Sequence, residues 1–261
     1  MVQDPVPHTL FFPEDMRRFF IDPQTIQDRE VTLPDQEAHH VSRVLRLRPG
    51  TQVELFDGTG AILQARLTTV HKGQVRAQVE DIVHPDTSPS PLPLTLMQAV
   101  LKGKKLDTVL QKATELGVEE CCLFPSHYCA VPKDLKQQEL RWQRIVFEAC
   151  KQCRRPIPMK ITYAPSPMHI DLALFTHKFL AHEQLQGGEL PLDLLTDQGP
   201  VCLFIGPEGG WHARETEHLL SKGCTLISLG AFILRGETAA ISACSIIQYL
   251  SRLSHQHATR H

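Results

Sequence analysis

Two glycine-rich turns carry residue types that could hold a ligand. In VCLFIGPEGGW (201–211) an apolar run ends in a loop with three glycines, one proline and Glu208. A second unusual turn, SLGAFILRGETAA (228–240), follows it. Glycine permits a positive φ and lets a ligand approach bare backbone. The two turns therefore indicate a pocket made largely of main-chain groups.

A phosphate is a poor candidate for this pocket. The chain has no GxxxxGK[ST], and Gly58-Thr-Gly60 lacks the third glycine of GxGxxG. The 206–210 loop contains no lysine, and Glu208 would repel a phosphate. A neutral or cationic ligand suits the loop better, and a tight turn without any ligand is the alternative. Gly236 and Glu237 also have an ordinary explanation, as a cap and a first-turn carboxylate of a helix.

Alternating strands and helices would position the two turns. Strands are expected at 94–100, 120–126, 178–183, 201–206 and 225–230, and helices at 105–118, 138–153, 213–222 and 237–253. Continuous apolar strands between helices indicate a parallel sheet that is covered on both faces. Ligands of such sheets bind beyond the carboxyl ends of the strands, where both turns would lie.

The first part of the chain has a different pattern. Polarity alternates over 51–56, 61–70 and 74–83, with turn residues at 57–60 and 71–73, which predicts β-strands. Asp35 is placed to cap a short helix over 35–45. These features predict a small β-barrel. The prolines of 84–93 then predict an extended linker rather than a helix or strand.

Composition sets wide limits on function. The chain has 261 residues, 42% hydrophobic and 21% charged, which is typical of a globular protein. A net charge of -2 gives no global signature of nucleic-acid binding, although local basic patches matter more than the sum. The start MVQDPVPHTL does not resemble a secretory signal, and no apolar run approaches the roughly 18 residues of a membrane helix.

Cysteine and histidine do not predict a metal site. The 8 cysteines are scattered and are interpreted as reduced thiols of a cytoplasmic protein. Cys150 and Cys153 form a lone CxxC, and the His39-His40 pair has no further ligands at metal spacing. We therefore expect no metal.

Together, GPEGGW and LGAFILRGETAA resemble the signature of the SPOUT superfamily of trefoil-knot methyltransferases, which use S-adenosylmethionine. Within it the chain resembles the RsmE family, which methylates N3 of a uridine in small-subunit (16S) ribosomal RNA. The resemblance is also carried by HHVSRVLRLRPG, LFDGTG, LKGKKLDTVLQKATELGV and RWQRIVFEACKQCRR. Four departures from the family pattern are Phe232 in place of arginine, Gly236 in place of threonine, Cys153-Arg154 in place of two small residues, and a loosely similar 125–134.

The resemblance implies a domain organisation. It predicts an α/β fold in which a SPOUT-type α/β knot, mainly parallel, follows a small PUA-like β-barrel. The barrel would bind RNA and comprise 1–84, the linker 85–93, and the methyltransferase domain 94–261. The family also implies a homodimer through the knot domain, in which each active site takes residues from the partner chain.

The resemblance further implies the cofactor site. S-adenosylmethionine carries a sulfonium and no phosphate, in agreement with the loop chemistry above. Its predicted pocket consists of Leu180, His182, Ile205, Gly206, Pro207, Gly209, Gly210, Leu229, Gly230, Ile233, Leu234, Thr238 and Ala239. Gly209→Val is expected to abolish cofactor binding by filling space beside the backbone.

Methylation of uridine N3 makes a defined physical demand. N3–H lies between two carbonyls, and loss of its proton leaves negative charge that a nearby cation or fixed donors must stabilise. Arg155, which matches a family arginine, is the first catalytic candidate, with Glu208 and Arg235 as polar partners. The alternative for Arg155 is a helix end that pairs with a carboxylate or with carbonyls. His127 is a possible base, but the sequence assigns none.

Basic residues predict the RNA contacts. Lys and Arg outnumber Asp and Glu between residues 102 and 160 in a chain that is negative overall. The expected RNA-binding residues are Arg43, Arg46, Arg48, Lys102, Lys104, Lys105 and Arg154. The partner would be small-subunit ribosomal RNA or the assembled small subunit, with no membrane. Alternatives are a SPOUT enzyme that acts on a ribose 2′-oxygen or another base, and a catalytically silent RNA-binding homologue.

Overall fold

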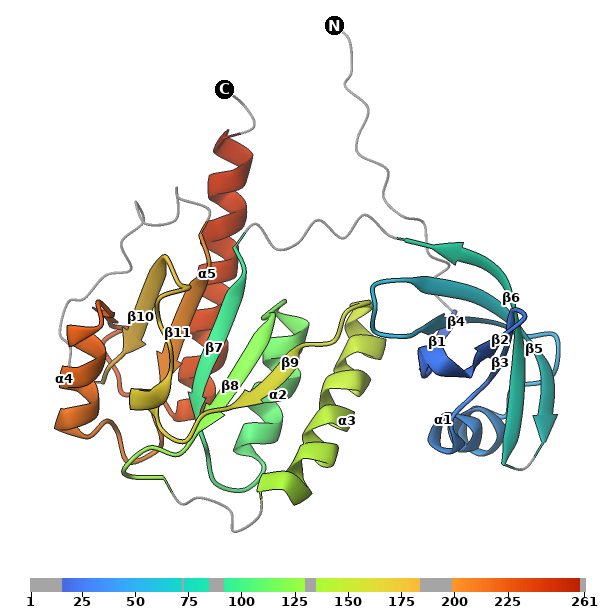
Figure 1. Ribbon diagram of the computed structural model, residues 1–261, viewed down its shortest axis with the longest axis horizontal. Coiled ribbons are helices and arrows are strands. Elements are labelled where there is room, and N and C mark those ends of the chain that lie inside the picture. The colour runs from blue at the N-terminus through green and yellow to red at the C-terminus, as the bar shows by residue number, and fades with distance from the viewer. Residues whose placement is uncertain (1–15, 72, 85–91, 130–134, 184–198, 259–261) are drawn as a thin grey trace, which may run out of the picture. The chain divides into compact units, whose positions relative to one another are not determined.

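A computed structural model of the chain describes residues 16–71, 73–84, 92–129, 135–183 and 199–258, with the side chains of 135–137 and 254–258 left aside (Figure 1). The chain divides into two compact units, Met1–Thr87 and Ser88–His261. Of the predicted linker, residues 85–91 lie outside the described part. Leu92 is buried, and the Pro93 carbonyl accepts a hydrogen bond from the Val201 amide.

A six-stranded sheet forms the first unit. Its order is β1 (Arg17–Phe20), β4 (Gln52–Phe56), β5 (Ile62–His71), β6 (Gln74–Val83), β3 (Glu30–Thr32) and β2 (Ile26–Gln27). β1 runs parallel to β4, and the other pairs are antiparallel. The three strands predicted from alternating polarity are confirmed. The sequence did not reveal β1, β2 and β3, because segments of 2 to 4 residues are too short to show a period.

The helix of this unit starts differently from the prediction. α1 spans Asp35–His39 and continues into a π-helical turn over His40–Val44. Pro34 occupies the N-cap and makes no side-chain cap bond, so the prediction that Asp35 caps the helix is wrong. Asp35 is the first helical residue, where its carboxylate favours the positive end of the helix dipole instead.

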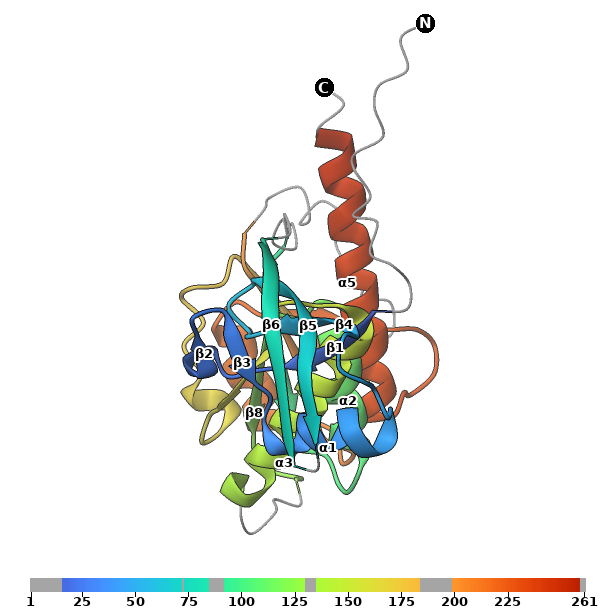
Figure 2. The same cartoon turned by 90° about the vertical axis from the view of Figure 1, so that its right-hand side faces the viewer.

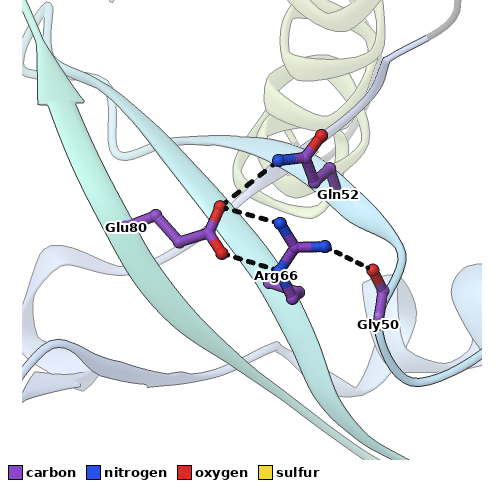
Figure 3. Close-up of polar contacts among 4 residues, drawn as sticks. All are labelled: Gly50, Gln52, Arg66 and Glu80. Atoms are coloured by element: carbon purple, nitrogen blue, oxygen red, sulfur yellow. Dashed lines mark hydrogen bonds and ion pairs between the residues drawn. The ribbon is translucent and has the colours of Figure 1, made fainter.

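Strand alternation separates an apolar core from a charged outer face. Leu63, Ala65 and Leu67 of β5 are buried, whereas Arg66 between them is not. Figure 3 shows the Arg66 guanidinium between Glu80 and Gly50: Nε lies 2.6 Å from Glu80 Oε1, and Nη1 donates to the Gly50 carbonyl over 2.9 Å. The hydrogen bond from Arg66 lowers the pKa of Glu80. Because both side chains are well exposed, we expect this pair to add little to stability.

All strand pairs in the sheet of the second unit are parallel. The order is β12 (Thr225–Ile227), β10 (His177–Ala181), β11 (Val201–Ile205), β7 (Leu94–Ala99), β8 (Glu120–Phe124) and β9 (Lys160–Tyr163). The prediction of a parallel sheet is therefore confirmed. β9 was not predicted: it is a short edge strand of mixed polarity, KITY, which carries no clear hydrophobic pattern.

Four helices cover this sheet. α2 (Lys105–Glu115) lies between α3 (Leu135–Cys153) and α5 (Gly236–Ala258), and α5 also packs on β7 and β11. Leu219 of α4 (Ala213–Ser221) packs in a separate core cluster with Met97 and Phe204. Figures 1 and 2 show the last turns of α5 reaching past the ends of the strands. No described helix has both the length and the apolar character needed to span a membrane.

Candidate functional site

A cavity of about 670 Å³ lies at the carboxyl ends of β10, β11 and β12. It is lined by residues 181–183, 205–211, 228–230 and 232–236, together with Lys105 and Ala239. The parallel register aligns Leu180 with Phe204 and Ala181 with Ile227, so the segments that follow these strands meet at one edge. Both glycine-rich turns line this cavity, and its volume suits a ligand of nucleoside size.

Trp211 joins two of the lining segments. Its Nε1–H donates to the Ala181 carbonyl over 2.9 Å, and its ring stacks on Phe124 with centroids 6.2 Å apart. A Cβ atom on Gly206 would lie 2.9 Å from Trp211 Nε1, which explains why the loop needs a glycine there. The sequence prediction left Trp211 out of the site, although it directly follows the loop.

The other loop glycines face different neighbours. Gly210 has φ +76° and lies against the Glu183 carboxylate, and Gly230 has φ +132° with nothing within 4 Å of a Cβ. A Cβ on Gly209 would lie 2.7 Å from Tyr128 Cβ. The expected mechanism for Gly209→Val therefore needs correction. The added side chain would strike Tyr128 and displace the loop, rather than fill open space in the pocket.

Two lysines fix the carboxylate of the loop. Glu208 Oε1 accepts from Lys105 Nζ at 2.9 Å and from the Lys102 amide at 3.1 Å. Partial burial acts to raise the pKa of Glu208, but these hydrogen bonds outweigh it and leave the pKa below its ordinary value. Glu208 is therefore an ionised anchor between the β11 loop and the start of α2. Arg235 also lines the cavity and is exposed.

Most of the predicted cofactor residues line the cavity. They are His182, Ile205, Gly206, Pro207, Gly209, Gly210, Leu229, Gly230, Ile233, Leu234 and Ala239. Leu180 does not, because strand alternation turns its side chain into the core, and Thr238 is exposed on the first turn of α5 outside the lining. The lining residues that the cofactor prediction missed are Lys105, Ala181, Glu183, Glu208, Trp211, Ser228, Phe232, Arg235 and Gly236.

Arg155 lies away from the cavity within one chain. Its Nη1 donates to the carbonyls of Thr114 at 3.1 Å and Val118 at 2.6 Å, and its Nε to that of Ile157 at 2.7 Å. These carbonyls belong to the end of α2 and to the segments before β8 and β9, at the amino edge of the sheet. Burial lowers the pKa of Arg155 from its ordinary value. The position matches the alternative in which this arginine binds carbonyls at a helix end.

The predicted RNA-binding residues fall into two groups. Arg43 is exposed in the π-helical turn that follows α1, and Arg46 and Arg48 are exposed in the segment after that turn. Lys102 and Lys104 are exposed before α2, whereas Lys105 is bound to Glu208, and Arg154 is partly buried in a left-handed conformation, φ +61°. Among the described residues, no three His, Cys, Asp or Glu side chains are grouped as metal ligands.

Family models match a part of each unit. An RNA methyltransferase domain matches residues 88–248, and an RNA methyltransferase PUA domain matches residues 33–80. The ribosomal RNA small subunit methyltransferase E of Synechocystis is 32% identical over 89% of this chain and 77% of its own length. That of Aquifex aeolicus is also 32% identical, over 72% of this chain and 81% of its own.

Solved structures agree with these matches. A methyltransferase of Legionella pneumophila in complex with the cofactor SAM superimposes with a TM-score of 0.83 at 28% identity, covering 90% of this chain and 97% of its own. The ribosomal RNA small subunit methyltransferase E of Neisseria gonorrhoeae, bound to S-adenosyl methionine, gives 0.76 at 31% identity, covering 90% of this chain and 98% of its own.

Proposed function

Because the chain belongs to the ribosomal RNA small subunit methyltransferase E family, we propose that it transfers a methyl group from S-adenosylmethionine to N3 of a uridine in small-subunit ribosomal RNA. One observation carries the proposal. Two glycine-rich turns, separated in sequence, line a single cavity at the carboxyl edge of a parallel sheet. Relatives of the same fold bind S-adenosylmethionine.

The residues around the cavity fit this cofactor. Apolar side chains such as Ile205 and Leu234 offer contact area for an adenosine, and the backbone of 229–234 offers amides and carbonyls for its polar edge. The carboxylate of Glu183 complements a ligand with a sulfonium and an ammonium group. When bound, the cofactor supplies an electrophilic methyl group. Among the described residues of the lining, Lys105 is the one lysine and Glu208 neutralises it, so a polyphosphate would fit poorly.

Arg235 is the residue proposed to assist the reaction at uridine. The developing charge on N3 and its flanking oxygens requires a cation that stays protonated, and a guanidinium meets this demand. Arg235 is exposed at the cavity, where it can hold the uracil oxygens. Glu208 is proposed to act indirectly, as the anchor of the loop. Arg155 would reach a cavity only from a second copy of the chain, so its catalytic role depends on a homodimer.

The wider organisation is also part of the proposal. We assign residues 1–84 to RNA binding, 85–93 to a linker and 94–261 to a methyltransferase domain that dimerises and acts in the cytoplasm. A trefoil knot is supported by the path of the chain. It leaves β12 at one edge of the sheet and forms α5 over β7 and β11, and a Cβ on Gly236 would lie 2.9 Å from Leu101 Cδ2.

Methyl transfer to small ribosomal subunits tests the function. Purified small subunits that lack the modification are incubated with the full chain and labelled S-adenosylmethionine, and the RNA is digested for mass spectrometry. We expect N3-methyluridine. A 2′-O-methylated or differently methylated nucleoside would assign another RNA target. Absence of transfer, together with no heat of cofactor binding in calorimetry, would indicate a silent RNA-binding homologue.

A further inference from the structure

Three rings gather beside the glycine loop, outside the lining of the cavity. His127 and Tyr128 follow β8, and His212 follows the loop after β11. The His127 centroid lies 4.8 Å from that of Tyr128 and 4.3 Å from that of His212, and Tyr128 and His212 are 5.9 Å apart. Tyr128 is 50% exposed and His127 is also exposed. We call these residues the ring cluster.

One buried carboxylate holds the two halves of the ring cluster together. Glu215, 5% exposed in the first turn of α4, accepts from Ser126 Oγ at 2.9 Å, the His127 amide at 3.0 Å and the His212 amide at 3.2 Å. A buried carboxylate is costly unless it is hydrogen-bonded, and these donors satisfy it. His212 Nδ1 in turn accepts from the Arg214 amide, which fixes the orientation of that ring. The backbone beneath His127 and the ring of His212 are therefore fixed, and the His127 and Tyr128 rings pack against them.

The ring cluster lies between the cavity and exposed lysines. Gly209 lines the cavity and its missing Cβ faces Tyr128, so the glycine loop is the wall between rings and cavity. On the other side, Cys129 Sγ donates to the Val100 carbonyl, which ties the turn after β8 to the segment that carries Lys102 and Lys104. Exposed rings, exposed ammonium groups and the cavity are thus neighbours at one edge of the sheet.

From this arrangement we propose that the ring cluster is a stacking platform for an unpaired base of the RNA, with Tyr128 as the principal contact. The inference deepens the proposed function and rests on it for the identity of the RNA. Proteins recognise single-stranded RNA by stacking its bases on Tyr, Phe, Trp or His, while lysines hold the phosphates. A uridine must leave any stack for its N3 to reach a methyl donor, and a ring surface next to the cavity compensates for the lost stacking.

The chemistry favours RNA over a protein partner. A protein interface core is typically apolar and depleted in lysine. Here the exposed surface combines imidazoles, a phenol and neighbouring ammonium groups, which matches the alternation of base faces and phosphates in a single strand.

The test compares Tyr128→Leu with Tyr128→Phe in the full chain. Leucine keeps apolar volume beside Gly209 but has no π-face, whereas phenylalanine keeps the ring. The probes are a fluorescent oligouridylate and an abasic strand of the same length, measured by anisotropy at one fixed salt concentration. We expect Tyr128→Leu to weaken oligouridylate binding about tenfold, since stacking contributes on that order per base. Tyr128→Phe should stay within about twofold, and the abasic strand should bind both variants alike.

Further readings separate stacking from structural support. Calorimetry of S-adenosylmethionine should give the same affinity for Tyr128→Leu as for the unaltered chain, and methyl transfer should show a raised KM for small subunits with kcat retained. Tyr249→Leu is the matched control, because Tyr249 is a 63% exposed tyrosine on α5 outside the cavity lining. Equal losses on both strands, no loss on oligouridylate, or a parallel loss of cofactor affinity would each overturn the proposal. Anisotropy measures RNA binding to the ring cluster even if no methyl group is transferred. Failure of the stacking proposal can therefore be distinguished from failure of the proposed function.

Discussion

The two edges of the parallel sheet use charged residues for opposite purposes. At the amino edge, the Arg155 guanidinium donates hydrogen bonds to three carbonyls and thereby joins the end of α2 to the segments that precede β8 and β9. At the carboxyl edge, Glu208 joins the β11 loop to the start of α2, and Glu215 joins the turn after β8 to the start of α4, beside a cavity that stays open. Strong polar contacts therefore do not by themselves mark the site. The site is marked instead by the main-chain groups of the two glycine-rich turns, which these contacts leave accessible to a ligand.

The comparison also explains the placement of the glycines. The loop glycines of the carboxyl edge lie against named neighbours: Trp211 for Gly206, Tyr128 for Gly209 and Glu183 for Gly210. Gly117, at the amino edge, has φ +83° but only Gln248 within 4 Å, as expected of a glycine that ends a helix. Close packing of the missing side chain distinguishes these three glycines from Gly117, but not from every glycine of the amino edge, because a Cβ on Gly199, just before β11, would strike the Thr176 side chain.

The largest effect is expected for Gly209→Val at the carboxyl edge. Overpacking against Tyr128 costs about 1–3 kcal/mol and would displace the loop, which corresponds to a loss of about five- to 150-fold in affinity for S-adenosylmethionine. Calorimetry measures the affinity, and circular dichroism checks that the fold is retained. Tight binding by a folded Gly209→Val chain would show that this loop does not form the cofactor pocket.

Arg155→Ala tests the amino edge. Loss of the guanidinium leaves three carbonyls without that donor, and we expect the free energy of unfolding to fall by about 2 kcal/mol. Urea denaturation measures the change. Affinity for S-adenosylmethionine should not change, because Arg155 is outside the cavity lining.

A conservative variant sharpens the assignment of Arg155. Arg155→Lys keeps the charge but cannot reach three carbonyls at once, so an intermediate stability is expected. If Arg155→Lys instead retained full stability and cofactor affinity while kcat fell, the residue would be catalytic, supplied from one chain to another.

Glu208→Gln should have a smaller effect at the carboxyl edge. The variant loses the ion pair with Lys105 but keeps an acceptor for the Lys102 amide, so we expect cofactor affinity to fall about threefold. Calorimetry with Glu208→Asp as a control measures it. A loss as large as that of Gly209→Val would mean that the carboxylate contacts the ligand itself.

The same pair predicts a pH dependence. Because the pKa of Glu208 in the folded chain is lowered from 4.5, its contribution to stability is present above about pH 4.5 and is lost as the pH falls through the folded-state value. The difference in stability between Glu208→Gln and the unaltered chain should therefore shrink in acid. Urea midpoints at pH 7 and pH 3.5 measure it, and a constant difference would contradict the assignment.

Arg66→Ala in the first unit removes an exposed ion pair and is expected to have the smallest effect on stability. The Arg66–Glu80 pair (Figure 3) is as short as the contacts at the sheet edges, at 2.6 Å, but its side chains are 43% and 39% exposed. We expect no resolvable change in the thermal midpoint and no change in cofactor affinity. A clear destabilisation would show that the exposure of an ion pair does not predict how much it contributes to stability.

Apolar patterning was sufficient to predict the parallel sheet and its helices. Buried strands such as VCLFI and amphipathic helices such as α2 carry their own signal in the spacing of residues. β1 and β9 carry none, because their place is fixed by pairing with β4 and β8 far along the chain. Short strands at sheet edges depend on tertiary contacts that a local pattern does not contain.

The sequence could predict those parts of the candidate site that are formed by main-chain groups. The glycines and their spacing predicted the position of both turns. They did not predict which side chains face the cavity: Leu180, for example, points into the core. Trp211, Glu183 and Glu215 act through partners that are distant in sequence, such as Ala181 and Ser126. Arg155 combines two features, since it matches a family motif and its nearest partners within one chain are carbonyls, so its catalytic assignment stays a prediction.

The bond between the Lys102 amide and Glu208 spans 106 positions of the chain, and the cavity also needs Ala239. During synthesis on the ribosome, a nascent polypeptide therefore cannot complete this cavity until residue 239 has left the exit tunnel. Products of premature termination after the first unit but before α5 would carry that unit, with its exposed arginines, yet lack the complete cavity.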